Sequence, residues 1–143
     1  MQQRDIIKDQ IEQLGKVLGK LITLMLGIKG NGNIIGNIEQ IAEEFDTELN
    51  IDLNKLIALE QDEFQKALAE KFQNFEAPLE QLGDLLFEIG QQCGPEGELR
   101  QQYLNKALWT YEYINTISST FSMERMGKMS LVKKLLIKPH QGT

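Results

Sequence analysis

Apolar residues recur along most of the chain at the three- and four-residue intervals of an α-helix, and no segment shows the period-two alternation of a half-buried strand. The strongest pattern opens the chain, where apolar positions are spaced by alternate steps of four and three over three heptads. These positions are Ile7, Ile11, Leu14, Leu18, Leu21, Met25 and Ile28. Val17, Ile22 and Leu24 widen the apolar stripe beyond the seam of a two-stranded coiled coil, which predicts a helix packed between neighbours in a bundle.

Helical spacing continues through the rest of the chain. It predicts further helices over about residues 38–49, 52–59, 62–72, 78–90, 98–118 and 122–137. Asp52 and Ser122 are suitable N-cap residues, and Pro78 fits a first helical turn, where its missing N–H would have no partner. We therefore expect an all-α protein, a bundle or array of antiparallel helical hairpins with six to seven helices. A single domain is predicted over residues 1–138, followed by a loose tail over residues 139–143.

The glycine- and asparagine-rich stretch GIKGNGNIIGN, residues 27–37, allows two interpretations. Gly30, Gly32 and Gly36 approach the glycine spacing of a dinucleotide-binding loop, in which the backbone comes close to a pyrophosphate. Such a loop follows a β-strand, however, whereas the segment before these glycines has the heptad spacing of a helix. The stretch is therefore predicted to connect two helices, with Gly30 ending the first of them, and no cofactor is expected.

The pattern between residues 79 and 114 resembles a tetratricopeptide helical hairpin. The matching positions are Leu82, Gly83, Leu86 and Gly90 on the first helix and Leu104, Ala107 and Leu108 on the second. The turn between them is about five residues longer than in that family, and one hairpin alone matches. The resemblance implies protein–protein recognition through a helical surface, and the small residues would let the two helices approach closely. The whole chain is also similar to uncharacterised small bacterial all-helical proteins, which implies no function.

Charge is distributed unevenly along the chain, whose net charge is −6. Residues 1–30 carry five basic and three acidic side chains, residues 31–100 carry four and sixteen, and residues 101–143 carry six and two. The acidic centre therefore lies between two basic ends. One interpretation is that the ends fold against the centre, and the other is that they offer a basic surface to an anionic partner.

Three features indicate a cytoplasmic protein without a transmembrane segment. Cys93 is the single cysteine, so no internal disulfide can form and a reducing compartment is expected. Acidic residues precede the first apolar cluster, unlike in a secretory signal. The uncharged run at residues 21–28 has eight residues, whereas a membrane-spanning helix needs about twenty.

Residue patterns typical of catalysis or metal binding are weak in this sequence. His140 is the single histidine and lies in the predicted tail, far from Cys93. No Glu-x-x-His pair suggests a di-metal site, and the acidic residues between 43 and 52 lack the spacing of a calcium loop. We therefore expect no catalytic residue, metal or cofactor and a protein that is not an enzyme, while a small carboxylate-dependent enzyme is the less favoured hypothesis.

Trp109 and Tyr113 are four residues apart on one predicted helix and share a face that points away from its main apolar stripe. They either meet another helix or form an exposed aromatic patch for a partner. The last predicted helix combines methionines with lysines, as a basic amphipathic helix does. The predicted partner-binding residues are Trp109, Tyr113, Lys106, Met126, Lys133 and Lys134.

These observations favour a protein–protein interaction module or scaffold, whose partner is an unidentified protein or a second copy of the chain in a homodimer. The alternative from a different class is a peripheral binder of an anionic membrane or of nucleic acid through the basic C-terminal helix. That helix contains no aromatic residue, which argues against stacking on the bases of single-stranded nucleic acid.

Overall fold

Seven α-helices make up the computed structural model of the chain, which describes residues 3–27, 34–94 and 97–136. They are α1 (Gln3–Gly27), α2 (Ile34–Leu49), α3 (Leu53–Ile57), α4 (Gln61–Phe72), α5 (Glu76–Gln92), α6 (Glu98–Ile117) and α7 (Met123–Leu136). No strand occurs in these ranges, which confirms the all-α prediction with six to seven helices. None of the helices in them is both long and apolar enough to span a bilayer.

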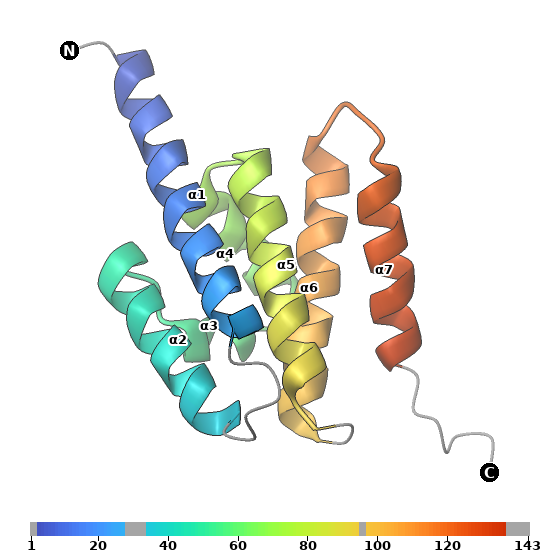
Figure 1. Cartoon of the computed structure of the whole chain (residues 1–143). Helices are drawn as coiled ribbons and strands as arrows, with labels where there is room; N and C mark the ends of the chain where they lie inside the picture. Colours follow the sequence, from blue (N-terminus) through green and yellow to red (C-terminus); the bar gives the residue numbers. More distant parts are fainter. Residues whose placement is uncertain (1–2, 28–33, 95–96, 137–143) are drawn as a thin grey trace.

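The helices α1, α5, α6 and α7 lie side by side in that order, as Figure 1 shows. α5 and α6 run in opposite directions, as do α6 and α7, so the second half of the chain is built from antiparallel neighbours. α1 and α5 run in the same direction because α2, α3 and α4 return the chain between them. α2 lies along the other side of α1, and α3 and α4 lie behind the row formed by α1 and α5.

The central contact of the fold is the hairpin formed by α5 and α6. Gly83 and Gly90 are both buried on the face of α5 that meets α6. A Cβ atom on Gly83 would lie 2.5 Å from Cε1 of Tyr111, and one on Gly90 would lie 2.7 Å from Cδ2 of Leu104. Both distances are shorter than van der Waals contact, so the missing side chains let the helices approach closely, as the sequence predicts.

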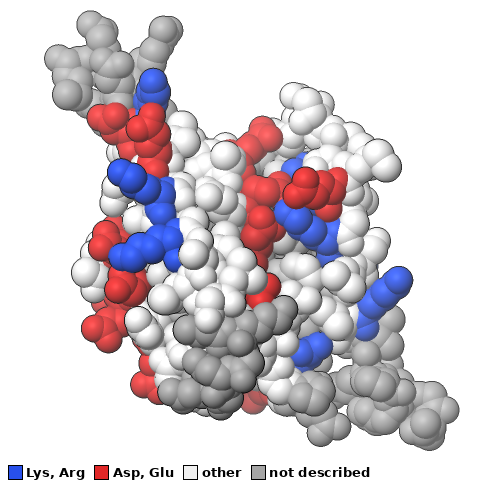
Figure 2. Space-filling model, viewed as in Figure 1, with Lys and Arg blue, Asp and Glu red and all other residues white. Residues whose placement is uncertain are grey.

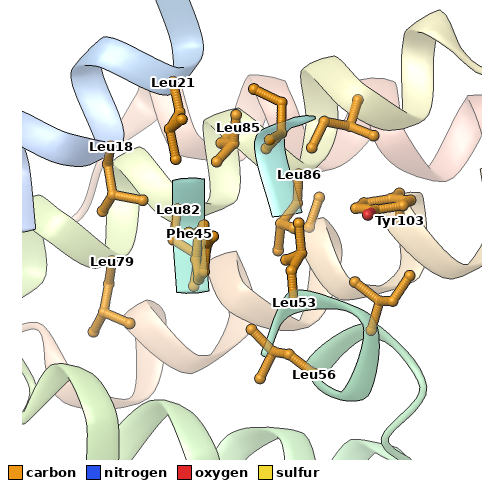
Figure 3. Packing of buried hydrophobic residues seen from close by; sticks show 14 of the residues in the cluster. Leu18, Leu21, Phe45, Leu53, Leu56, Leu79, Leu82, Leu85, Leu86 and Tyr103 are labelled. Carbon is orange, nitrogen blue, oxygen red and sulfur yellow. The ribbon is translucent and has the colours of Figure 1, made fainter. Parts of the chain in front are cut away.

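The apolar stripe of α1 is buried over only part of its length. Leu18, Leu21 and Met25 are completely buried, and Figure 3 shows Leu18 and Leu21 pointing toward Leu82 of α5 and Phe45 of α2. Burying a leucine side chain stabilises the folded state by about 2 kcal/mol. Toward the N-terminus the stripe leaves the core, because the first turns of α1 extend past the other helices (Figure 1). Ile7 and Ile28 lie outside the part of the chain whose side chains are described.

Gly15 and Gly19 face α5 rather than solvent. The side-chain amide of Gln81 donates a hydrogen bond from Nε2 to the backbone oxygen of Gly15 at 3.1 Å. A Cβ atom on Gly19 would lie 3.6 Å from the same Nε2. The absence of side chains at these two glycines therefore leaves room for the Gln81 side chain against α1.

Side-chain hydrogen bonds cap the starts of α3 and α7. The carboxylate of Asp52 accepts a hydrogen bond from the backbone N–H of Lys55, and the hydroxyl of Ser122 accepts one from Arg125, so both N-cap predictions are confirmed. The start of α2 differs from the prediction, since α2 begins four residues earlier, at Ile34, and includes Gly36. Ile34 packs against the core, and this contact extends the helix past its glycine.

Three predictions fall wholly or partly outside the described residues. They are the connection after the first helix, of which residues 28–33 are not described, the turn at residues 94–97, and the tail at residues 139–143. Gly97, at the end of that turn, has a backbone φ of 132°, which a glycine adopts much more readily than other residues.

Replacing Gly83 by alanine tests the close approach of α5 and α6. Alanine favours a helix over glycine by about 1 kcal/mol, but its Cβ would overlap the ring of Tyr111. We expect Gly83→Ala to lower the free energy of unfolding by about 1–3 kcal/mol, measured by urea denaturation followed by circular dichroism.

Gly19→Ala is the matched control, because its new Cβ would make an ordinary contact with Gln81. This variant should be as stable as the natural protein or more stable. Equal stabilisation by both substitutions would show that α5 and α6 are not held at the distance described here.

Candidate functional site

Trp109 and Lys106, two of the predicted partner-binding residues, lie on the side of α6 that faces α4. Lys106 is almost completely buried, with 6% of its surface exposed, and its Nζ lies 4.5 Å from the centre of the Trp109 ring. On α4, the ring of Phe64 lies 6.1 Å from that of Trp109, tilted by 59°. Burial lowers the pKa of Lys106, partly offset by the charge of Glu60. This cluster joins α6 to α4 and leaves little of Lys106 accessible to a partner.

Tyr113 is half-buried and reaches the turn between α4 and α5. Its hydroxyl donates a hydrogen bond to the side-chain oxygen of Asn74. Asn74 and its neighbour Gln73 both have left-handed backbone conformations, with φ values of 62° and 49°. The Trp109–Tyr113 pair therefore meets another part of the chain, one of the two arrangements that its spacing allows, and binding of a partner by these residues stays a prediction.

The other three predicted residues lie on α7, away from the Trp109 side of α6. Met126 is 39% exposed, and the amide of Asn115 on α6 points to its sulfur at 3.8 Å. Lys133 and Lys134 are exposed, and neither forms an ion pair within the described part of the chain. The six predicted residues thus form two separate groups.

A buried arginine joins α7 to the two helices beside it. Arg125 is only 5% exposed. Its Nη1 donates a hydrogen bond to Oε1 of Glu80 on α5 at 2.9 Å, and its Nε donates to Oδ1 of Asn115 on α6 at 2.8 Å. A buried charge is tolerated when it is paired and hydrogen-bonded in this way.

Lys128 forms the second bridge between α7 and α5. Its Nζ lies 2.8 Å from Oδ1 of Asp84 and 3.7 Å from Oε2 of Glu80. The hydroxyl of Tyr111 donates to the same Asp84 oxygen at 2.7 Å. We call Glu80, Asp84, Tyr111, Arg125 and Lys128 the ionic cluster. Figure 2 shows acidic and basic atoms gathered in the region of α5, α6 and α7.

The ionic cluster changes the protonation of two of its members. Burial alone would lower the pKa of Lys128, but the hydrogen bond to Asp84 and its negative charge, together with Glu124 and Glu80, raise it by more, so that it lies above the ordinary value of 10.5. Burial, followed by the charge of Asp84, raises the pKa of Tyr111. Lys128 therefore stays charged and Tyr111 stays neutral well into the alkaline range.

The ionic cluster was not predicted, although its acidic half is visible in the sequence. Glu80 and Asp84 belong to a row of carboxylates spaced four residues apart along α5, from Glu76 to Glu88. Residues with this spacing share one face of a helix. The row predicts an ion-pair site only once Arg125 and Lys128 of α7 are known to face it, and the sequence does not show this. These ion pairs, with that of Lys20 and Glu44, agree with the interpretation that the basic ends fold against the acidic centre.

An open groove of about 410 Å³ lies where α1 leaves its neighbours. Its apolar part consists of Leu14 of α1, Leu49 of α2 and Phe75 before α5, all of them half-buried. The exposed charged residues at its edge are Asp9, Glu48 and Lys71, with glutamines between them. We call these six residues the N-terminal groove. A second hollow of about 490 Å³ along α1 shares Asp9 and carries Glu12 and Lys16.

The geometry of the N-terminal groove depends on three chain segments that are far apart in the sequence. Leu14 belongs to the apolar stripe of α1, and Leu49 ends α2. Phe75 is placed by the left-handed turn at Gln73, whose N–H donates to the oxygen of Ala69 at 3.1 Å. The groove could not be found from one local pattern, although the apolar stripe contains one of its residues. It offers an apolar surface with a polar edge and no cluster of metal-ligating groups.

Within the described ranges, no group of three or more His, Cys, Asp or Glu side chains is arranged to hold a metal ion. Comparison with known proteins gives no match to this chain among protein-family models, curated proteins or solved structures.

Removing the charge of Arg125 tests the ionic cluster. Arg125→Met leaves Glu80 without its closest cation and Asn115 without a donor, so we expect a loss on the order of 3 kcal/mol in the free energy of unfolding. In the double variant Glu80→Leu/Arg125→Met no charge is left unpaired at this pair, and most of the loss should be recovered. Urea denaturation of the three proteins measures both effects, and a double variant less stable than Arg125→Met would contradict the pairing.

Alkaline pH should destabilise the protein through its buried tyrosines. Burial raises the pKa of Tyr103 and of Tyr111, so each binds its proton more tightly in the folded state. Stability from these groups is complete below the ordinary pKa of 10.0 and falls above it, by up to about 1.4 kcal/mol per pH unit for each group. Lys128, with a raised pKa, adds to this loss above its ordinary value of 10.5. The lowered pKa of Lys106 works against this loss of stability, but only at pH values below the ordinary lysine pKa of 10.5.

Tyr103→Phe isolates one of these contributions, because the buried Tyr103 hydroxyl has no hydrogen-bond partner among the residues that the structure describes. We expect this variant to match or exceed the stability of the natural protein at neutral pH and to lose stability less steeply above pH 10. Urea denaturation across this pH range gives both slopes, and identical slopes would refute the contribution of Tyr103.

Proposed function

We propose that the protein is a non-enzymatic protein-binding module of the helical-hairpin type, and that its N-terminal groove binds a short segment of a partner protein. The observation that supports this proposal is that the apolar stripe of α1 is not covered by other helices near its N-terminal end. Ile11 and Leu14 continue the same seam as the buried Leu18, yet both are partly exposed where α1 passes the other helices. An apolar helix face beside an open groove is a common mode of peptide recognition.

The composition of the N-terminal groove indicates the chemistry of the segment. Leu14, Leu49 and Phe75 would bury an apolar side chain, and the volume of about 410 Å³ lies in the range of small binding sites. Of the charged residues at the edge, Asp9 and Glu48 are acidic and Lys71 is basic. The expected segment therefore carries an apolar residue flanked by lysine or arginine.

Two expectations from the sequence support the same proposal. The resemblance of residues 79–114 to a tetratricopeptide hairpin points to protein recognition, since helical surfaces serve that purpose in the family. The single cysteine, Cys93, is a buried free thiol, which suits a protein of the reducing cytoplasm. We propose that location for it.

The alternative proposal is peripheral binding to an anionic membrane or to nucleic acid through α7. Exposed Lys133 and Lys134, close in sequence to exposed Leu131, favour it. Arg125 and Lys128, however, face Glu80 and Asp84 and contribute little free positive charge. Two lysines supply roughly 1 kcal/mol each at an anionic surface, which is weak attraction for a protein of net charge −6. We therefore favour the protein partner.

Selection from a random peptide display library on the immobilised protein tests the groove. Selected peptides should share an apolar residue next to lysine or arginine. Reversing two charges at the edge, with Asp9→Lys and Glu48→Lys, should weaken their binding roughly tenfold, equivalent to about 1.4 kcal/mol, measured by fluorescence anisotropy.

The matched control reverses two exposed carboxylates outside the groove, with Glu39→Lys and Glu63→Lys. This protein has the same net charge as the groove variant but should bind the peptides as the natural protein does. If both variants lose affinity for the peptides equally, the effect comes from net charge. If both keep their affinity, the peptides bind elsewhere. Either result would refute the groove as the binding site.

A further inference from the structure

Three of the five methionines in the chain lie close together at the beginning of α7. Met123, Met126 and Met129 are three residues apart, so neighbouring members have about 5–6 Å between their Cβ atoms on the helix surface. Met129 is 5% exposed and belongs to the core, whereas Met126 is 39% exposed and Met123 is 80% exposed. Core packing therefore explains the buried methionine but not the other two.

The sulfur atoms of Met126 and Met129 converge on one point. The side-chain Nδ2 of Asn115 on α6 donates to both of them, at 3.8 Å to Sδ of Met126 and at 3.4 Å to Sδ of Met129. A thioether sulfur is a weak hydrogen-bond acceptor, so these contacts direct two sulfurs toward the same place without holding them strongly. A cation that attracts sulfur more strongly than an N–H group does would compete for that place.

The charges around the two sulfurs do not exclude a cation. The guanidinium of Arg125 lies beside the Asn115 amide, with Nε 2.8 Å from Oδ1, and it is paired with Glu80 through Nη1. Lys128, the other nearby cation of α7, is paired with carboxylates of both α5 and α7. These two positive charges are balanced by the three carboxylates of Glu80, Asp84 and Glu124. An ion of single positive charge would therefore not enter a region of net positive charge.

Thioether sulfur determines which kind of cation fits. It is a soft, neutral ligand that favours Cu(I), whereas Mg²⁺ and Ca²⁺ take oxygen ligands. Structural Zn²⁺ sites use cysteine and histidine, and no group of three or more His, Cys, Asp or Glu side chains in the described ranges is arranged to hold a metal. The expectation of no metal, made from the sequence, rested on those ligand types, and methionine is not one of them.

We propose that Met126 and Met129 bind a soft monovalent cation, Cu(I), at the place where the Asn115 amide contacts their sulfurs, with Met123 as a third sulfur ligand. The cation displaces the amide, so that two metal–sulfur bonds replace two weak N–H···S contacts. Met123 is free to turn toward the cation because most of its side chain is exposed. The site is separate from the N-terminal groove and does not rest on the proposed function.

Nuclear magnetic resonance of the methionine methyl groups tests the site directly. The protein, labelled with ¹³C at these methyl carbons, is titrated in chloride-free buffer with Ag(I), a stable substitute for Cu(I) with the same charge and the same preference for sulfur. We expect the signals of Met123, Met126 and Met129 to shift together. The signal of Met25, which is buried in α1 at the other end of the row of helices (Figure 1), should not move. Unchanged signals of Met126 and Met129 in excess Ag(I) would overturn the proposal.

Replacing the two converging sulfurs should remove the site. Met126→Leu/Met129→Leu keeps the apolar volume, a kind of exchange that protein cores tolerate, and circular dichroism checks that the helix content is unchanged. We expect isothermal titration calorimetry to show that this variant binds Ag(I) about tenfold more weakly or worse. Met126→Leu alone, at a partly exposed position, should also weaken binding. Affinity equal to that of the natural protein in both variants would contradict the assignment to these sulfurs.

Two further variants define the ligand set. Met25→Leu is the matched control, since it removes one sulfur from another part of the core, and it should bind Ag(I) as the natural protein does. Loss of affinity in this control equal to that of the double variant would overturn the proposed site. Met123→Leu should weaken binding by a smaller factor than the double variant, and an unchanged affinity would overturn the role of Met123 as a ligand.

The pH dependence of binding distinguishes thioethers from the other soft ligands in the chain. The single cysteine, Cys93, and the single histidine, His140, must each be unprotonated to bind a metal, whereas a thioether carries no proton. The Ag(I) affinity should therefore be the same at about pH 5 and about pH 7.5, on either side of the ordinary histidine pKa. A marked loss of affinity at the lower pH would assign binding to Cys93 or His140 and overturn the proposal.

The selectivity of the site is tested with Zn²⁺ under the same conditions. A site made of neutral thioethers should leave the methyl signals of Met126 and Met129 unchanged in Zn²⁺ at concentrations where Ag(I) shifts them. This result supports the proposal. Equal shifts with both metals would show that the site does not select a soft cation, which would overturn it.

Discussion

The close packing of α5 against α6 is the constraint on which the rest of the structure depends. Gly83 and Gly90 remove two side chains from the line of contact, and Tyr111 and Leu104 occupy the space. The paired helices then form a central unit whose two outer sides receive α1 and α7, with α4 behind it (Figure 1). A larger separation between α5 and α6 would move Tyr111 away from Asp84 and thereby loosen the attachment of α7.

Sequence patterns predicted the helices and much of the core because both depend on spacing within one segment. Leu82 and Leu86, for example, repeat at helical intervals and are buried as expected. The beginning of α2 was not predicted, since its first turn contains Gly36 and Ile34 packs against residues far away in the sequence. The N-terminal groove was predicted only in part for the same reason. Leu14 is visible as a stripe residue, but Leu49 and Phe75 meet it only through the path of α2, α3 and α4.

Charge organises the chain at a larger scale than any single site. The acidic centre and the basic ends are neutralised in part by contacts such as Lys20 with Glu44 and Lys128 with Asp84. α1 and α7 lie at opposite ends of the row formed by α1, α5, α6 and α7 (Figure 1).

The carboxylates of the ionic cluster also have a consequence for the order of events during synthesis. Like charges four residues apart weaken an isolated helix by about 0.2–0.5 kcal/mol per pair, so the row along α5 repels itself when it leaves the ribosome. Lys128, which neutralises Asp84, follows 44 residues later in the chain. The nascent protein thus carries an electrostatic defect that only a distant, later segment can repair. Pairing with α7 therefore offsets part of this repulsion only after the last helix has been made.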